Sequence, residues 1–415
     1  MCNTNWAGNY AYRAARLHHP HTVEALRKLV ARADKLKVLG TRHSFNDIAD
    51  TDGDLVSLAH LNRVLALDMD ATHPSVTIEA GVTYGQLAHH LHAGGYALPN
   101  LASLPHISVA GACATATHGS GDDNGILATS VRAVELISAD GEVKRFSREH
   151  EEFRGAVVAL GGLGAMTELT LDIVPAFDAR QEVYQDLPLT EFAEHFDAIM
   201  SSAYSVSLFT DWRTSGFNQL WLKQRGAATI DPESFGATPA RQRLHPIAGI
   251  SAENCTEQLG IPGPWHERLP HFRMDFMPSA GEELQSEYFV PRERAIAALR
   301  AIDAMSERIA PHLQISEVRS IAADDLWMSP CHRQPCIAIH FTWRKDWPAV
   351  RALLPVIEAQ LSPFDARPHW GKLFTIFPAQ LQPLYPKLED FRNLLRKYDS
   401  RGKFRNAFLD RYVFG

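Results

Sequence analysis

Residues 40–46 read Gly40-Thr41-Arg42-His43-Ser44-Phe45-Asn46 and directly follow the apolar pair Val38-Leu39. Where a strand ends on a glycine, successive backbone N–H groups can curl into a concave nest that binds an anion such as a pyrophosphate. His43 places a reactive imidazole in the middle of this loop. Taken alone, the run is also compatible with an ordinary turn.

A second loop contains almost only small residues, from Ser108 to Gly121. Small side chains let the backbone approach a ligand closely, and Ser and Thr add hydroxyl donors. A tight helix-packing site is the alternative for this run by itself. Two such loops within one domain favour a bound dinucleotide.

The surrounding pattern predicts an α+β fold. We expect a helix between Thr22 and Ala33, another over 84–93, and a hairpin at Asp140-Gly141 between strands 131–138 and 142–146. Hairpin signals recur where a doubly wound parallel fold would need crossover helices. The further expected elements are strands at 37–40, 64–69, 76–80, 169–174, 314–318 and 337–343, helices at 291–309 and 350–361, and long ordered loops over a second sheet from Gly226 to Pro278.

Composition limits the function. The chain has 415 residues, enough for two or three domains, and 41 Lys and Arg against 48 Asp and Glu give a net charge of −7, which argues against nucleic acid. No run approaches the ~18 apolar residues of a spanning helix, and the start Met1-Cys2-Asn3 is polar. We therefore expect a cytoplasmic monomer without a membrane partner. Cys331 and Cys336 could pair, but five Cys are too sparse for a disulfide framework, so reduced thiols are expected.

Several common sites are excluded by inspection. The chain has no G-x-G-x-x-G, no P-loop, no G-x-S-x-G and no H-E-x-x-H motif. The His-rich runs 18–21 and 89–92 lack acidic or Cys ligands at a fitting spacing, so we expect no metal site. Their histidines are interpreted as exposed helical and loop residues.

A resemblance to a known family joins these features. The two loops, together with Gly161-Gly162-Leu163-Gly164, resemble the flavin domain of the vanillyl-alcohol-oxidase-type (PCMH) flavoproteins. Runs 5–9, 98–106 and 369–372 are similar to the alditol oxidases, including xylitol oxidase, and the resemblance covers essentially the whole chain. It implies a PCMH-type FAD-binding domain at 1–175, a substrate domain at 176–375 with a mixed or antiparallel sheet covered by helices, and a segment 376–415 that returns to the FAD domain.

The resemblance also implies covalent FAD. In that family a His of the first loop is bonded to the isoalloxazine 8α carbon, and His43 occupies that place; the alternative is a His hydrogen-bonded to the loop. The matched cofactor-binding positions are Val38, Leu39, Gly40, Thr41, Arg42, His43, Ser44, Ser103, Ser108, Gly111, Thr115, Ala116, Thr117, His118, Met166 and His369.

Residues on two strand patterns are candidates for the substrate site. Glu317 and Arg319 are two residues apart and so share a face, as do His340 and Thr342. A structural ion pair is the plain alternative. By the resemblance, the positions that bind the polyol are Ser103, Glu317, Arg319, Thr342 and Lys372, and Ala102 is the small residue that leaves room for O2.

The resemblance thus predicts an FAD-dependent oxidase of acyclic polyols such as xylitol, sorbitol or glycerol. Hydride would pass from C1 to flavin N5 to give the aldose, and O2 would be reduced to H2O2. Arg319 and Lys372 would stabilise developing negative charge. The catalytic base is either His340 or Lys372. The alternatives are a sugar-1,4-lactone oxidase of the gulonolactone type, with its His-x-Gly-Lys element, and a flavin-binding protein without catalysis.

Overall fold

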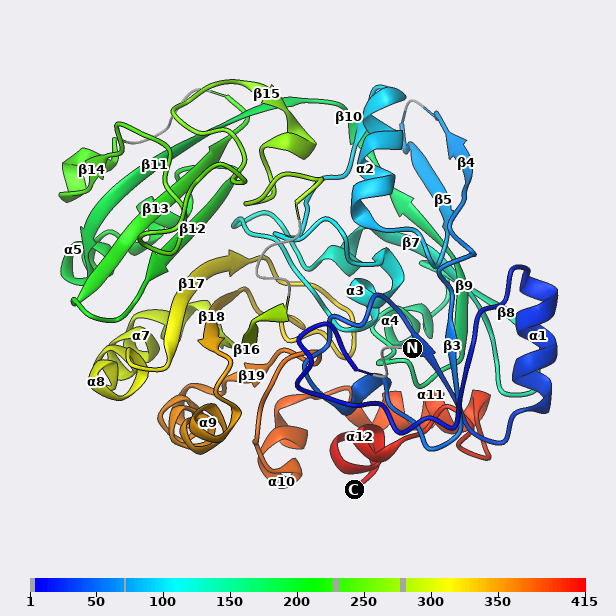
Figure 1. Ribbon diagram of the computed structural model, residues 1–415. Helices are drawn as coiled ribbons and strands as arrows, with labels where there is room; N and C mark the ends of the chain where they lie inside the picture. Colours follow the sequence, from blue (N-terminus) through cyan, green and yellow to red (C-terminus); the bar gives the residue numbers. More distant parts are fainter. Residues whose placement is uncertain (1–3, 71, 227–230, 277–280) are drawn as a thin grey trace.

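The computed structural model describes residues 4–70, 72–226, 231–276 and 281–415. The start Met1-Cys2-Asn3 and residues 227–230 and 277–278 of the expected loop segment lie outside the described residues. Figure 1 shows two sheet-containing parts, with the N-terminal strands and the C-terminal helices on one side and the largest sheet on the other. The expected α+β class with two domains is confirmed.

The part that contains the N-terminal strands has short sheets of both kinds. Its strands are β1 (Arg16–His18), β2 (Leu36–Leu39), β3 (Asp54–Ser57), β4 (Val64–Asp68), β5 (Ser75–Glu79), β6 (Tyr96–Ala97), β7 (Val131–Ile137), β8 (Val143–Ser147), β9 (Ala165–Asp172) and β10 (Val174–Pro175). An antiparallel sheet has the order β4-β5-β9-β7-β8, a parallel one has β1-β3-β2, and β10 pairs with β6. The strand β2 delivers the chain directly into the loop that begins at Gly40.

Local signals explain why the early helices were predictable. The helix α1 (Val23–Arg32) begins after Thr22, whose side chain accepts a hydrogen bond from the backbone N–H of Ala25. A capping box of Thr83 and Gln86 starts α2 (Tyr84–Ala93). The turn between β7 and β8 contains Gly141 at φ 84°, a conformation that favours glycine. These helices and this hairpin are confirmed.

The large sheet is antiparallel and has the order β14-β11-β13-β12-β17-β18-β16-β19. Its strands are β11 (Asp178–Pro188), β12 (Ser205–Thr210), β13 (Gly216–Gln224), β14 (Thr238–Pro239), β16 (Glu283–Pro291), β17 (Leu313–Ile321), β18 (Cys336–Arg344) and β19 (Arg367–Pro368), and β15 (Gly263–Pro264) pairs with β11 off this path. The antiparallel arrangement agrees with the expectation for the substrate domain.

The two faces of the large sheet have different covers. One buried cluster joins the sheet to α5 (Leu189–Glu194), α6 (Phe196–Met200), α7 (Ala295–Asp303), α8 (Ser306–Ile309) and α9 (Trp347–Leu361). On the other face, loop side chains such as Leu244 and Phe272 pack on Phe209 and Trp221. The helix expected at 291–309 is divided into α7 and α8, and α7 begins only at Ala295, because Pro291 ends β16 and Arg292–Arg294 form a short 3-10 helix.

The C-terminal helices pack against the N-terminal sheets. They are α10 (Pro378–Leu381), α11 (Leu388–Tyr398) and α12 (Ala407–Leu409), and their apolar side chains belong to the same buried cluster as β5 and β9. The backbone N–H of Leu36 donates to the carbonyl of Lys403 at 2.9 Å. The exact division at residues 175 and 375 stays a prediction.

The small-residue stretch differs from the expected loop. Residues Val109–Ala114 form the short helix α3, and a second short helix, α4 (Phe153–Ala156), lies further along the chain. Within α3, Val109, Ala112 and Cys113 are buried, so their small volumes serve helix packing. The helix-packing interpretation therefore holds for Val109–Ala114, and the approach of this stretch to a ligand stays a prediction.

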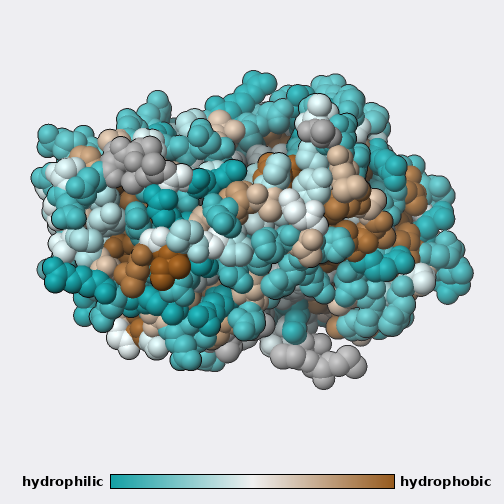
Figure 2. Space-filling view, turned by 90° about the horizontal axis from the view of Figure 1, so that it is seen from above, coloured by the Kyte–Doolittle hydropathy of each residue, from teal (hydrophilic) through white to brown (hydrophobic). Residues whose placement is uncertain are grey.

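The surface and thiols complete the description. Among the described residues, no helix is long and apolar enough to cross a membrane. Figure 2 shows a face that is mostly hydrophilic with some hydrophobic patches. The described cysteines, Cys113, Cys255, Cys331 and Cys336, are free and buried.

Candidate active site

A cavity of about 520 Å³ lies between the 40–44 loop, α3 and one face of the large sheet. A neighbouring cavity of about 250 Å³ shares Gly40, Thr41, Ser108 and Gly111 with it. The predicted site residues on the wall of the larger cavity are Val38, Leu39, Gly40, Thr41, Arg42, His43, Ser44, Ala102, Ser103, Ser108, Gly111, Thr115, Thr117, His118, Glu317, Arg319, His340, Thr342, His369 and Lys372.

Two predicted cofactor-binding residues lie elsewhere. Met166 is on the wall of the smaller cavity, next to Gly164. Ala116 is fully buried in a turn at φ 58° and lies on the wall of neither cavity. Its side chain packs in the core, so only its backbone can contribute to the site.

The loop after β2 contains a residue in the left-handed region. Arg42 has φ 66°, a conformation of the kind found in anion-binding nests. A Cβ atom on Gly40 would lie 2.8 Å from Ser108 Oγ, and one on Gly111 would lie 2.7 Å from the same atom. The two glycines thus leave room for the Ser108 hydroxyl beside the loop, and this lining of glycine backbone and a hydroxyl donor fits the pyrophosphate of FAD.

His43 sits in a largely apolar setting. Its ring stacks on Trp6 with centroids 5.1 Å apart and lies 4.6 Å from the ring of His106. Its Nδ1 lies 3.1 Å from Thr41 Oγ1, whereas its Nε2 is buried without a hydrogen-bond partner. Burial, with a smaller effect of His106, lowers the pKa of His43 to about 3. The imidazole is therefore neutral and keeps a nucleophilic lone pair at neutral pH.

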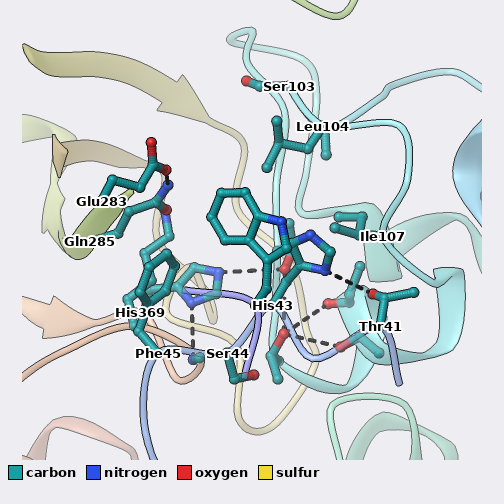
Figure 3. A pocket seen from close by; sticks show the side chains of 18 of the residues that line it. Thr41, His43, Ser44, Phe45, Ser103, Leu104, Ile107, Glu283, Gln285 and His369 are labelled. Atoms are coloured by element: carbon teal, nitrogen blue, oxygen red, sulfur yellow. Dashed lines mark hydrogen bonds between the residues drawn. The ribbon is translucent and has the colours of Figure 1, made fainter. Parts of the chain in front are cut away.

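Figure 3 shows how the walls face each other. His43 lies between Thr41 and Ile107 on one side and Glu283 and Gln285 on the other, with Leu104 and Ser103 above it in this view. The backbone N–H of Gly371 donates to Nδ1 of His369 at 3.0 Å, so the proton of a neutral His369 resides on Nε2. That Nε2 lies 3.5 Å from Thr117 Oγ1, which places His369 beside the α3 wall.

Side chains alternate between the two faces of each strand, so polar residues face the cavity and apolar residues face the helices. In β18, Ile339 and Phe341 pack against the helices, whereas His340 and Thr342 face the cavity. Strand pairing puts His340 directly between Glu317 of β17 and Glu287 of β16. Three strands thus bring a row of polar residues to one face.

The cations of this face are held by carboxylates. Lys372 Nζ lies 2.8 Å from Glu287 Oε2 and 2.7 Å from His340 Nδ1. Arg319 Nη2 donates to Glu287 Oε1 at 3.3 Å, and its Nη1 donates to Ser103 Oγ at 3.4 Å. The structure therefore brings Ser103, Arg319, His340 and Lys372 together, as predicted from their positions.

Burial sets the protonation of this group. Burial lowers the pKa of Lys372, and Glu287 partly opposes this effect. Burial and the charge of Lys372 lower the pKa of His340 to about 4, well below the ordinary value on which its candidacy as a base rested. For Glu317, burial raises the pKa, but Arg319 and His271 outweigh burial and hold the pKa well below its usual range.

Two residues of this group were not predicted from the sequence. Glu287 is the shared partner of the cations, and His271 donates from Nε2 to Glu317 Oε1 at 2.7 Å. The alternation Glu283, Gln285, Glu287 was a usable signal, because three polar residues at a period of two mark one face of a strand. His271 lies in the loop segment 226–278, where no periodic pattern pointed to it.

The histidine-rich runs take no part in the site. His89 and His92 lie on α2 and contact the ring of His266, with centroids 5.4 and 4.5 Å apart. Within the ranges that the structure describes, no group of three or more His, Cys, Asp or Glu side chains is arranged to hold a metal ion.

Comparisons with known proteins agree with this geometry. The family described as "FAD binding domain" matches residues 14–147, and that described as "D-arabinono-1,4-lactone oxidase" matches residues 277–412. The chain is 50% identical over 407 residues to the alditol oxidase of Streptomyces sp. (strain IKD472 / FERM P-14339), covering 98% of this chain and 97% of that protein. It is 29% identical to the L-gulonolactone oxidase of Mus musculus, covering 99% and 98% of the two chains.

Solved structures support the fold. A solvent-stable cholesterol oxidase has a TM-score of 0.79 at 16% identity, covering 98% of this chain and 96% of that one. The cholesterol oxidase from B. sterolicum has a TM-score of 0.77 at 13% identity, covering 99% and 96%. The fold is thus shared with these distant structures, and the half-identical relative, matched over nearly its whole length, shows that this chain belongs to the alditol oxidase family of FAD-dependent oxidoreductases.

Proposed function

We propose that the protein oxidises the C1 primary hydroxyl of acyclic polyols, such as xylitol, sorbitol and glycerol, to the aldose and reduces O2 to H2O2. The observation that carries this proposal is that Glu317, Arg319 and Lys372 open into the same cavity as the His43 loop. Carboxylate acceptors beside cationic donors suit a chain of adjacent hydroxyls. The half-identical relative named as an alditol oxidase supports the same substrate class.

FAD, when bound, supplies the acceptor for the hydride of C1 and the route by which electrons reach O2. Gly40, Ser108, Gly111 and Thr115 would hold its pyrophosphate with backbone N–H groups and hydroxyls. We further propose that His43 carries the cofactor covalently. Its neutral imidazole and the unpartnered buried Nε2 support this assignment.

The substrate would be oriented by residues of two strands, β17 and β18, and of two loops. Glu317 accepts hydrogen bonds from hydroxyls, and its own position is fixed by His271. Thr342 Oγ1 lies 3.0 Å from His340 Nε2 and can bind a hydroxyl at the same time. Arg319 and Lys372 aim positive charge at the C1 oxygen, where negative charge develops, and such oriented donors stabilise a transition state.

The hydroxyl proton has two possible acceptors. His340 is neutral near pH 7 because its pKa is about 4. Lys372 has a lowered pKa and contacts the same imidazole at 2.7 Å. Because Lys372 Nζ and His340 Nδ1 lie within hydrogen-bond distance, a proton can pass between them, and we assign the base to one member of this pair. Ala102, which is small and lies on the cavity wall, would leave room for O2.

A sugar-1,4-lactone oxidase is the second candidate. The match of residues 277–412 to the D-arabinono-1,4-lactone oxidase family points to it, but the relative named L-gulonolactone oxidase is only 29% identical, so the polyol assignment is favoured. Turnover of xylitol and of an aldono-1,4-lactone by the same preparation separates the two functions. A clear preference for the lactone would overturn the polyol assignment.

Covalent attachment has a direct test. The wild-type protein should give a fluorescent band under ultraviolet light after denaturing electrophoresis. His43→Ala should give no such band and should release yellow flavin on acid precipitation. His106→Ala is the matched control, because it removes the neighbouring ring and leaves His43 in place. Flavin that stays with the His43→Ala polypeptide would refute the assignment.

A further inference from the structure

Glu287 is a buried carboxylate behind the wall of the candidate active site. It is 1% exposed and lies on β16 between Gln285 and Phe289, on the same face of the strand. Gln285 lines the cavity, whereas Glu287 does not. An ionised carboxylate is costly to bury, so its contacts require an explanation.

The two oxygens of the carboxylate contact Lys372, Arg319 and the imidazole of His118. Oε2 lies 2.8 Å from Lys372 Nζ. Oε1 lies 3.3 Å from Arg319 Nη2 and 3.1 Å from His118 Nε2. Burial raises the pKa of Glu287, but Lys372 and His118 outweigh burial and keep the pKa well below its ordinary value. Glu287 therefore remains charged.

We propose that Glu287 is the positioning residue of this site: it does not touch substrate, and it acts by holding Lys372 as an ammonium ion aimed at the C1 oxygen. The inference rests on the proposed polyol oxidation for its kinetic consequence. An ammonium has three N–H donors, and the contacts with Glu287 and His340 use two of them. One donor is left for the substrate.

Charge balance shows why the carboxylate matters. Glu287 and Glu317 together balance Arg319 and Lys372; the first three of these residues are buried, and the side chain of Lys372 is 14% exposed. Loss of the negative charge on Glu287 leaves an uncompensated cation in a low-dielectric region, and release of a proton from Lys372 is the direct way to relieve it. The charged and titratable groups that face Glu287 from neighbouring elements are Glu317 and Arg319 on β17, His340 on β18, His118 after α3, and His369 and Lys372 after β19.

The local geometry argues against a purely structural ion pair. Lys372 follows the short strand β19, and the backbone N–H of His369 donates to the carbonyl of Glu287 at 3.0 Å. The backbone therefore holds this segment against β16 without the side chain of Glu287. What the carboxylate adds is the direction and the charge of the Lys372 side chain.

The test compares Glu287→Gln with Glu358→Gln. Glu358 is also a buried carboxylate, 9% exposed, but it contacts Tyr288 and Thr375 on the helix side of the sheet. We expect Glu287→Gln to slow anaerobic flavin reduction by xylitol roughly 10- to 100-fold, less than the ~10²–10³ lost on removing a donor itself. Glu358→Gln should leave the rate unchanged. Equal rates in the two variants would overturn the proposal.

The pH profile distinguishes positioning from mere packing. Because the ammonium form of Lys372 loses its partner, the midpoint that belongs to Lys372 should move to lower pH in Glu287→Gln. In a Lys372→Met background, the Glu287→Gln substitution should change the reduction rate little further, since its effect passes through Lys372. Independent, additive losses, or an unmoved midpoint, would contradict the mechanism.

A readout without turnover separates this inference from the proposed function. The visible spectrum of the resting flavoprotein, titrated without substrate, should shift its midpoint to lower pH in Glu287→Gln. If xylitol fails to reduce the wild-type flavin, the polyol assignment fails, and this titration still decides the role of Glu287. Should Glu287→Gln not fold, Glu287→Asp keeps the charge but withdraws it by one methylene. For Glu287→Asp, a lower rate of flavin reduction with an unchanged pH midpoint would then support the positioning role of Glu287. Reduction kinetics equal to those of the wild-type protein would overturn the proposal.

Discussion

Replacing Lys372 by Met tests the electrostatic part of the mechanism. The substitution keeps much of the side-chain volume and removes an ammonium that lies 2.8 Å from Glu287 Oε2 and 2.7 Å from His340 Nδ1. Removing one oriented donor from a developing oxyanion raises a barrier by about 3–4 kcal/mol, so flavin reduction by xylitol should slow ~10²- to 10³-fold. Removing one partner of a buried pair typically costs about 3–5 kcal/mol of stability. Since Arg319 remains 3.3 Å from Glu287, the loss here should be near or below the lower end of that range.

Rapid mixing of the anaerobic enzyme with xylitol measures the reduction step, and mixing of the reduced enzyme with O2 measures reoxidation. We expect the first rate to fall far more than the second. Lys397→Met is the control, because Lys397 is an exposed lysine paired with Glu152 and its loss changes the net charge equally. Unchanged reduction in Lys372→Met, or a loss confined to reoxidation, would refute the reasoning.

Two further variants probe the surroundings of the site. Because burial and Lys372 lower the pKa of His340 to about 4 from 6.5, the wild-type protein should lose up to about 3 kcal/mol of stability as the pH falls from 6.5 to 4, and His340→Gln should lose less over the same interval in denaturation experiments. Lys223 is buried and donates to the carbonyls of Arg268 and Pro270 at 2.7 and 3.0 Å, which fixes the chain beside His271. Lys223→Met should therefore raise the KM for xylitol more than it lowers the rate at saturation, and an unchanged KM would count against this role.

The predictable parts of the fold are those that depend on contacts between residues close together in the sequence. Thr22 and Thr83 cap their helices through contacts three residues away, so both helix starts can be read from the sequence. The Asp140-Gly141 hairpin is equally local. The division of the helix expected at 291–309 was missed, because the period of apolar residues continues through the break at residues 304–305.

The candidate site was predictable only in part, for the same physical reason. The loop of His43 and the pair of Glu317 and Arg319 are contiguous or nearly so, and a family resemblance could be attached to them. Glu287 meets its partners across 32 residues for Arg319, 85 for Lys372 and more for His118, through the register of three strands. The register between strands cannot be read from the sequence of a single segment. The role of Glu287 as the shared partner of these residues is therefore seen only in the structure.

The two faces of the large sheet have different roles: one packs apolar side chains against helices, and the other presents polar side chains on the cavity side. On β16 and β18 the residues that point to the helices, such as Tyr288, Ile339 and Phe341, are fully buried and belong to one apolar cluster. The alternate residues, Glu287 and His340, face the cavity side and are polar although buried. A buried charge network is often no more stable than an apolar core of the same volume. The protein can keep this charge network because the helix face of the same strands supplies the apolar burial that stabilises the fold. The cavity face can therefore hold cations at fixed positions. A flexible, solvated ion pair would stabilise a transition state far less.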